Sequence, residues 1–186
     1  MNRRNLIAGL AVPAVASAAS PSKWSNPFAQ QLRDDFLAHW RVEKQYSLEV
    51  LGAMPDEHFH LKPTPMQRTF AEQVGHYAFA NCNYFAKFGK SPRRPQVPNE
   101  TTPATLLAFL NDSYSYVEAV LLALTEEDFA RRDISMGSTP LSRHTAQDLF
   151  LRAYMHSAHH RGSLVVYLRL AGVKPPRWRF QAQGVA

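Results

Sequence analysis

Cysteine is almost absent from this sequence. The 186 residues include a single cysteine, Cys82. One cysteine cannot form a disulfide within the chain, and it cannot build the thiolate cluster of a structural zinc site. Because Cys82 stands among aromatic residues, we interpret it as an inert core thiol rather than a reactive one.

A strong charge excess and long apolar runs are also missing. Lysine and arginine total 21 against 15 acidic residues, and the basic residues are scattered along the sequence. Nucleic-acid binding needs a clustered basic patch, so we interpret these charges as solvated surface and expect no nucleic-acid partner. No segment has the ~20 consecutive apolar residues that a membrane-spanning helix needs. With 45% hydrophobic residues, the chain fits one globular domain.

The first 18 residues have the three parts of an export signal peptide. A basic segment with Arg3 and Arg4 precedes an apolar run from Leu6 to Val15, and Ala16-Ser17-Ala18 forms a small-residue cleavage site. The adjacent arginines suit the twin-arginine route, but the general secretory route also accepts them, and both stay open. We therefore expect removal of residues 1–18 and a periplasmic or secreted protein.

Four long segments carry apolar residues mostly at three- and four-residue steps, the pattern of amphipathic helices. They run from Pro27 to Met54, from Phe70 to about Phe88, from Pro103 to Leu124, and from a start between Thr139 and Ser142 to Gly172. Prolines and capping residues mark their ends, and Thr69 with Glu72 has the spacing of a capping box. No segment has a convincing strand pattern. We predict an all-α fold, a four-helix bundle over residues 27–172 followed by a C-terminal tail over residues 173–186.

Three of the eight histidines fall within five positions of the last helix. His156 and His160 lie one turn apart, about 40° around the helix, so both imidazoles can reach one metal ion. His159 lies about 60° to the other side of His156 and is a poorer partner. His144 is placed in the first turn of this helix, ~18 Å from His156, which is too far to share an ion. Two ligands do not complete a site, so a third must come from elsewhere in the chain.

The third ligand has two candidates, His39 and His76. His76 shares its helix face with the polar residue Glu72 on a helix otherwise rich in aromatic residues, and buried polar groups need partners. His39 has Asp35 one turn earlier as a local hydrogen-bond partner. The pattern favours His76 and keeps His39 as the alternative.

Two well-known metal-site motifs are missing. The string His156-Ser-Ala-His-His lacks the glutamate of the metalloprotease motif H-E-x-x-H. Di-iron bundles need Glu-x-x-His twice on inward helix faces, and this sequence has it once, at Glu57 and His60, in a turn. Neither class of metalloprotein is expected.

These segments together resemble the DinB/YfiT-like superfamily. The resemblance rests on Thr69-Phe-Ala-Glu-Gln-Val-Gly-His76 and on His156-x-x-His159-His160-Arg161-Gly162, and it covers residues 27–172. It implies a four-helix bundle in a 1-2-4-3 arrangement that holds a divalent metal ion through His76, His156 and His160. The sequence departs from the family at Ser163, where a glutamine usually follows Arg-Gly. That glutamine is not a ligand, so the departure affects packing around the site rather than the ligand set.

Three neutral imidazoles would leave a metal ion its full charge and an open position, as in catalytic sites. Zn or Ni is the expected ion, and Fe, Cu and Mn are alternatives because imidazole suits several metals. Glu72 is the natural general base near the site, although the helix cap competes for its carboxylate. Arg161 is interpreted as part of an interhelical salt bridge rather than as an anion ligand.

Two functions follow from these predictions. The resemblance implies a metal-dependent transferase of the thiol-dependent type, or a hydrolase, acting on a small-molecule substrate. The alternative is a non-catalytic, exported metal-binding or stress-response protein. A homodimer is compatible with either function.

Overall fold

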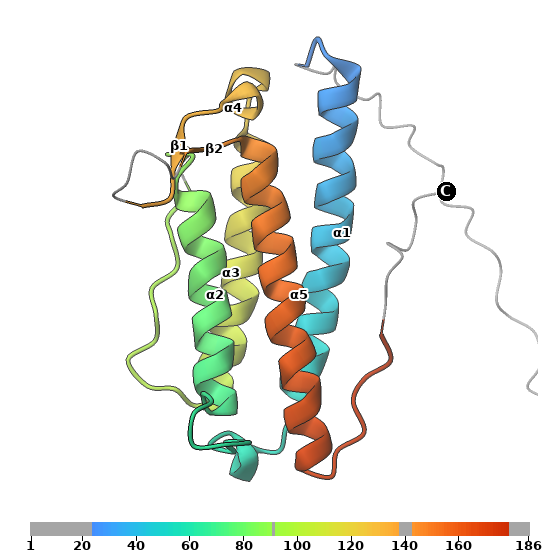
Figure 1. Ribbon diagram of the computed structural model, residues 1–186, viewed down its shortest axis with the longest axis vertical. Helices are drawn as coiled ribbons and strands as arrows, with labels where there is room; N and C mark the ends of the chain where they lie inside the picture. The colour runs from blue at the N-terminus through green and yellow to red at the C-terminus, as the bar shows by residue number, and fades with distance from the viewer. Residues whose placement is uncertain (1–23, 91, 138–142, 179–186) are drawn as a thin grey trace, which may run out of the picture.

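The computed structural model describes residues 24–90, 92–137 and 143–178, and the predicted signal peptide and tail residues 179–186 lie outside these ranges. The described fold is all-α (Figure 1). Its long helices are α1 (Pro27–Gly52), α2 (Phe70–Ala86), α3 (Pro103–Ala123) and α5 (Ala146–Leu170). The short elements are the 3-10 helix η1 (Asp56–His58), α4 (Glu126–Ala130), and the antiparallel strands β1 (Ile134–Ser135) and β2 (Arg143–His144). Among the described helices, none combines the length and the apolar character that crossing a membrane requires.

Each long helix begins after a residue whose side chain accepts a hydrogen bond from the first turn. These capping residues are Asn26, Thr69, Thr102 and Thr145. Such bonds satisfy N–H groups that the helix itself leaves without a partner. The predicted starts of the first three long helices are therefore confirmed.

The start of α5 differs from the prediction. The helix begins at Ala146 rather than between Thr139 and Ser142, because Arg143 and His144 form strand β2. A two-residue strand is too short to leave an alternating pattern in the sequence. His144 accordingly precedes α5, where its ring bonds to the Asp148 carboxylate.

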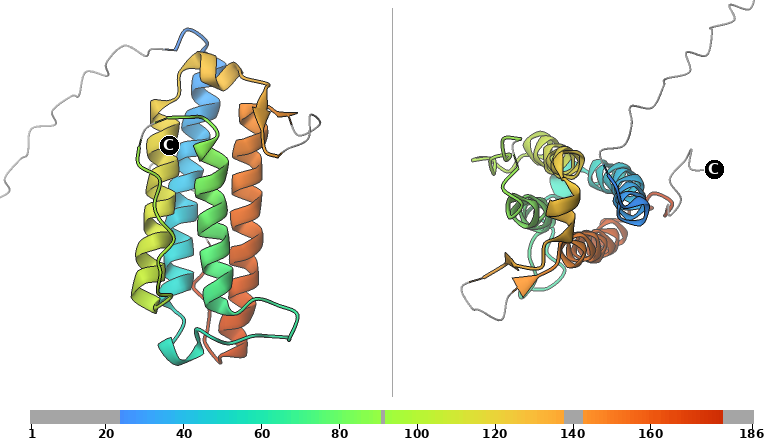
Figure 2. Two further views of the ribbon diagram at one scale, coloured as in Figure 1. Left: turned by 90° about the vertical axis from the view of Figure 1, so that its left-hand side faces the viewer. Right: turned by 90° about the horizontal axis from the view of Figure 1, so that it is seen from above.

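The helices follow one another around the bundle in the order α1, α3, α2, α5 (Figure 2). The 1-2-4-3 arrangement implied by the family resemblance would make the first two helices neighbours, whereas these contacts place α1 and α2 on a diagonal. Connections of the length seen here, such as residues 53–69, do not force consecutive helices to be neighbours as short loops do. Residues 92–102 return along the bundle, so α2 and α3 run in the same direction (Figures 1 and 2).

The interior of the bundle has two parts. An aromatic core lies toward α4 and consists of Phe36, Trp40, Phe85, Phe88, Phe129 and Phe150. Farther along the same helices lies a polar interior of buried residues, which consists of Glu43, Ser47, Asn81, Tyr114, Ser157 and Arg161. The candidate functional residues border this second part.

Candidate metal centre

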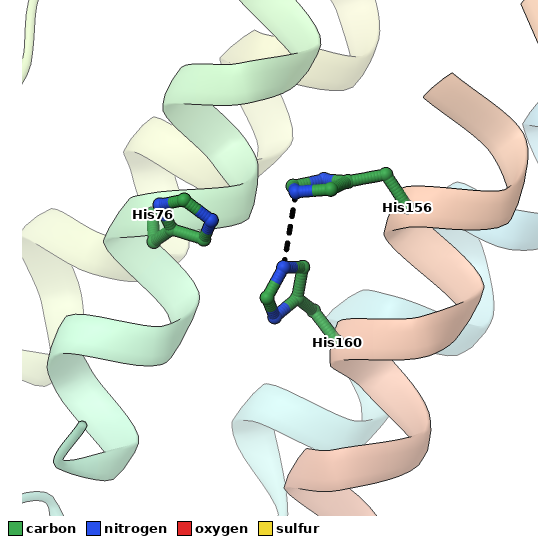
Figure 3. Close-up of side chains that lie close together, drawn as sticks. All are labelled: His76, His156 and His160. Atoms are coloured by element: carbon green, nitrogen blue, oxygen red, sulfur yellow. Dashed lines mark hydrogen bonds between the residues drawn. The ribbon is translucent and has the colours of Figure 1, made fainter. Parts of the chain in front are cut away.

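Three histidines from two adjacent helices converge beside the polar interior. His76 projects from α2, His156 and His160 project from α5, and the three rings lie close together between the helices (Figure 3). His156 and His160 reach the same point because they are one helical turn apart. The contact between α2 and α5 supplies the third ring. The fold thus brings together the three residues that the sequence analysis selected.

The distances fit a single metal ion. One ligand nitrogen from each ring lies within 4.8 Å of the others. The Nε2 atoms of His156 and His160 are 3.0 Å apart. Around an ion with Zn–N bonds of about 2.0 Å in tetrahedral geometry, ligand nitrogens lie about 3.3 Å apart. Small side-chain adjustments are enough to reach that geometry, so these residues fit a divalent metal ion.

The three imidazoles are held in their neutral form. Burial is the main cause that lowers the pKa of His76, and the charge of Arg68 adds to it. Burial, together with the neighbouring histidines and Arg68, lowers the pKa of His156 to about 4 and that of His160 to about 3. A histidine must be neutral to bind a metal ion. At neutral pH these side chains therefore need not lose a proton first.

The side-chain amide of Gln73 lies against the ring of His160. Its Nε2 atom is 2.6 Å from Nδ1 of His160, and the side chain is buried. With the amide as donor, Nδ1 accepts and the ring proton sits on Nε2, facing His156. A metal-binding His160 needs the opposite tautomer, with the proton on Nδ1 and Nε2 free. Turning the amide by 180° presents its oxygen to that proton, because the two ends of the amide have nearly the same shape.

Gln73 is not among the predicted site residues. A signal was available, because Gln73 lies three residues before His76 and therefore close to it on the same side of α2. Metal-binding histidines commonly bond through their second ring nitrogen to a residue of this kind. An amide or carboxylate about one turn from a candidate ligand therefore indicates such a partner in the sequence.

Two tyrosines of α2 pack against the histidine rings. The ring of Tyr77 lies parallel to that of His160 at 7°, with centroids 6.2 Å apart. Tyr84 meets His156 edge-on at 87° and 5.8 Å. Nδ1 of His156 is buried and has no hydrogen-bond partner within the described part of the chain. At its Nδ1 side, His156 is therefore held by packing, whereas His160 is held there by the bond to Gln73.

A cavity of about 620 Å³ adjoins the cluster through His160 and Gln73. Its other walls come from the connection that precedes α2, from the first turn of α2 and from α5. They include Lys62, Met66, Arg68, Glu72, His159 and Tyr167. A small molecule in this cavity would lie against the ring of His160. The predicted ligand cluster is therefore accompanied by a space of the size that substrates occupy.

Glu72 lies on the cavity wall, but its carboxylate takes part in the cap of α2. Oε2 of Glu72 accepts the backbone N–H of Thr69 at 2.8 Å, and Oγ1 of Thr69 accepts the N–H of Glu72 at 3.1 Å. The capping box is thus confirmed. The bond from the Thr69 backbone is also the main cause that lowers the pKa of Glu72, which makes it a weaker base. A catalytic role for Glu72 stays a prediction.

The remaining candidates lie outside the cluster. His39 is on α1, with its ring 6.4 Å from that of Tyr154. Arg161 forms a buried ion pair with Glu43 of α1, which confirms the predicted interhelical salt bridge. Cys82 is buried, and burial raises the pKa of its thiol to about 11, as expected for an inert cysteine.

Comparisons with known proteins agree with this fold. A family model described as the DinB superfamily matches residues 39–164. The uncharacterized protein YjoA of Bacillus subtilis (strain 168) is 27% identical over 146 residues, which are 77% of this chain and 91% of that protein. The crystal structure of a DinB-like protein from Bacillus cereus ATCC 10987 matches with a TM-score of 0.67 and 20% identity, over 78% of this chain and 97% of the other.

The crystal structure of YjoA, also described as DinB-like, matches with a TM-score of 0.62 and 20% identity, over 80% of this chain and 99% of the other. At this level of identity the solved structures show the shared fold. The family match covers more than half of the chain and includes His76, His156 and His160. The chain belongs to the DinB superfamily.

Proposed function

We propose that this protein is a metal-dependent enzyme that acts on a small molecule, as a thiol-dependent transferase or a hydrolase. His76, His156 and His160 would hold one divalent ion, with Zn or Ni expected and Fe, Cu and Mn as alternatives because imidazole suits several metals. The observation that carries the proposal is the convergence of three ligand nitrogens within 4.8 Å beside a cavity of about 620 Å³. A metal centre next to a substrate-sized space is typical of a catalytic site.

The chain's own residues have distinct tasks in this proposal. A bound divalent ion acts as a Lewis acid, which lowers the pKa of a water or thiol and polarises a substrate carbonyl. The neutral imidazoles of the three histidines leave the charge of the ion uncompensated, which strengthens its action as a Lewis acid. With its amide oxygen turned toward Nδ1, Gln73 would favour the metal-binding tautomer of His160 and hold its ring in place. Tyr77 covers the ring of His160 and belongs to the fully buried interior.

Metal analysis of the purified protein tests the site. We expect about one divalent ion per chain. His160→Ala should lose the ion because only two of the three imidazole ligands remain. His159→Ala is the matched control, since His159 is an exposed neighbour outside the cluster, and it should keep the ion. Normal metal content in His160→Ala would remove that residue from the site.

A non-catalytic metal-binding protein is the second candidate. The cap bond of Glu72 favours it, because the natural base near the cluster is already occupied. The metal-loaded protein can be assayed with cysteine plus 1-chloro-2,4-dinitrobenzene for thiol transfer, and with p-nitrophenyl acetate for hydrolysis. Turnover that chelation abolishes and that His160→Ala lacks supports an enzyme. If the metal-loaded protein shows no turnover in either assay, the second candidate is supported. If Glu72→Gln keeps its turnover, Glu72 is not the general base.

We also propose that the protein is exported to the periplasm or secreted after removal of residues 1–18. The support is the arrangement of a basic segment, an apolar run and a small-residue cleavage site in the sequence. Replacing Arg3 and Arg4 by lysine should block export if the twin-arginine route is used. Normal export of that variant would assign the chain to the general secretory route, and a cytoplasmic wild-type chain would contradict the proposal.

A further inference from the structure

The cavity beside His160 has two cations on its walls and a single carboxylate. Lys62 and Arg68 lie on the connection that precedes α2, and no ion pair involving either is found among the described residues. The carboxylate is that of Glu72, which the N–H of Thr69 holds at 2.8 Å. Both cations lower the pKa of Glu72, so they are near it without pairing with it. The positive charge of this wall therefore remains available to a ligand.

Tyr167 fixes the segment that carries Arg68. Its hydroxyl donates to the backbone carbonyl of Arg68 at 2.6 Å, and its ring lies 6.0 Å from that of Phe70 at the start of α2. Tyr167 is on α5, two turns after His160, so this bond ties the cationic segment to the helix that carries two of the histidines. Arg68 is thus anchored on the side of the metal centre.

The chemistry of this space favours one class of ligand. Three neutral imidazoles do not offset the charge of a divalent ion, and the two cations add to it, so a loaded site is strongly positive. Electrostatic complementarity then selects a negatively charged partner. Met66, which is 93% exposed, offers apolar contact on the same walls. The volume of about 620 Å³ is within the range that small-molecule sites occupy.

We propose that Lys62 and Arg68 recognise an anionic group of the substrate. The substrate is then a small molecule with a carboxylate or phosphoryl group, joined through an apolar part to the group that reacts at the metal centre. The assignment of a reacting group at the metal centre depends on the function proposed above. Recognition of the anion by two side chains does not require the metal ion, so the two proposals can be tested separately.

Binding of matched probes to the full chain tests this assignment. Phenylacetate and phenylphosphonate are titrated by calorimetry at low ionic strength against neutral phenylacetamide, with metal-loaded and with chelator-treated protein. We expect at least one anion to bind about tenfold more tightly than the amide in both forms, since bonds to charged groups are stronger than neutral ones. Added salt should weaken this preference because exposed charges are screened.

Variants test whether the two cationic side chains cause the preference for the anionic probes over the amide. Lys62→Gln and Arg68→Gln should each weaken anion binding up to about fivefold, and the double variant should lose the preference. Both side chains are exposed, so folding should be intact, which circular dichroism checks. Arg132→Gln is the matched control, because Arg132 is exposed and follows α4 at the opposite end of the bundle (Figure 1).

The outcomes separate the two proposals. Equal binding of anions and amide, or a preference that survives in the double variant, would overturn the assignment of Lys62 and Arg68. A preference that disappears on chelation alone also overturns it, because the anion then binds the metal ion. A chain that holds no metal but prefers the anions through these side chains supports this inference and contradicts the metal-dependent function.

Discussion

The two parts of the bundle interior use the same helices in different ways. In the aromatic core, the rings of Phe85 and Phe150 stack at 4° with centroids 5.8 Å apart, and Phe36 lies 5.1 Å from Phe150. In the polar interior, the same helices turn ionisable and hydrogen-bonding groups inward, among them Glu43 and Arg161. The change occurs within single helices, since Phe150 and Arg161 both belong to α5.

The difference shows where stability and function are placed. Buried rings gain free energy from apolar burial and ring packing, whereas buried polar groups cost free energy unless they find partners. The polar interior pairs several of its groups, for example Ser47 with Tyr114 at 2.9 Å and Ser157 with Asn81 at 2.9 Å. Nδ2 of Asn81 has no partner within the described residues. We infer that the aromatic core stabilises a fold whose other part carries the site.

Removing a ring from the aromatic core should have the largest effect. Phe150→Ala takes away a side chain that meets four other rings, and we expect the free energy of unfolding to fall by about 4 kcal/mol. Urea unfolding measures it, with Leu151→Ala as the control because that neighbour is 59% exposed. Metal content per folded chain should stay unchanged. Loss of metal at full stability would contradict the division between the two parts.

Breaking the buried ion pair should have the next largest effect. Glu43→Gln leaves the guanidinium of Arg161 buried without its carboxylate, which should cost about 3 kcal/mol. The matched control is Glu118→Gln, which removes an exposed pair with Arg41, also between two helices, and should cost less than about 1 kcal/mol. If urea unfolding gave the same loss of stability for both variants, the buried pair would contribute no more than a surface ion pair.

Much of this fold could be predicted because residues close to each helix end mark where the helix begins or stops. A capping threonine followed by proline or glutamate acts within one turn, so the sequence alone locates the starts of α2 and α3. The order of helices around the bundle is different, because it depends on long connections that carry no local pattern. Strands β1 and β2 are not predicted by the sequence, because two residues each are too few to form an alternating pattern.

The candidate site divides in the same way. His156 and His160 follow from helical spacing, a local property, and His76 from the polar face of a single helix together with the family resemblance. The position of Gln73, three residues before His76, marks it as a candidate partner, but only the packing of α2 against α5 shows that it bonds to His160, 87 positions along the chain. The competing roles of Glu72 were both visible in the sequence, and the structure shows which bonds its carboxylate makes.

Replacing Gln73 tests how the metal ligands are supported, and its effect should be intermediate. Gln73→Leu removes the partner of Nδ1 of His160, so we expect metal affinity to fall about 10- to 100-fold while three ligands remain. Competition with a chromogenic chelator measures the affinity. Gln67→Leu is the control, since Gln67 is an exposed glutamine on the same cavity wall. Unchanged affinity in Gln73→Leu would mean that packing alone orients His160.

The dependence of stability on pH should give the sharpest contrast between the aromatic core and the histidines that border the polar interior. The pKa of His156 is about 4 and that of His160 about 3, both below their ordinary value of 6.5. As pH falls below 6.5, the unfolded chain takes up protons at these positions and the folded protein does not until about pH 4. The stability of the metal-free protein should therefore decrease over this interval.

Urea unfolding with a chelator at several pH values separates this contribution from that of the carboxylates. The double variant His156→Gln with His160→Gln should lose part of the slope, because its folded and unfolded states no longer differ in proton uptake at these two positions. His60→Gln, which changes an exposed histidine, should keep the full slope. Phe150→Ala should lower the whole curve by a constant amount, because no proton is taken up there. If the double variant kept the full dependence of stability on pH, His156 and His160 would not be the source of that dependence. The proposed contrast between the aromatic core and the histidines that border the polar interior would then be wrong.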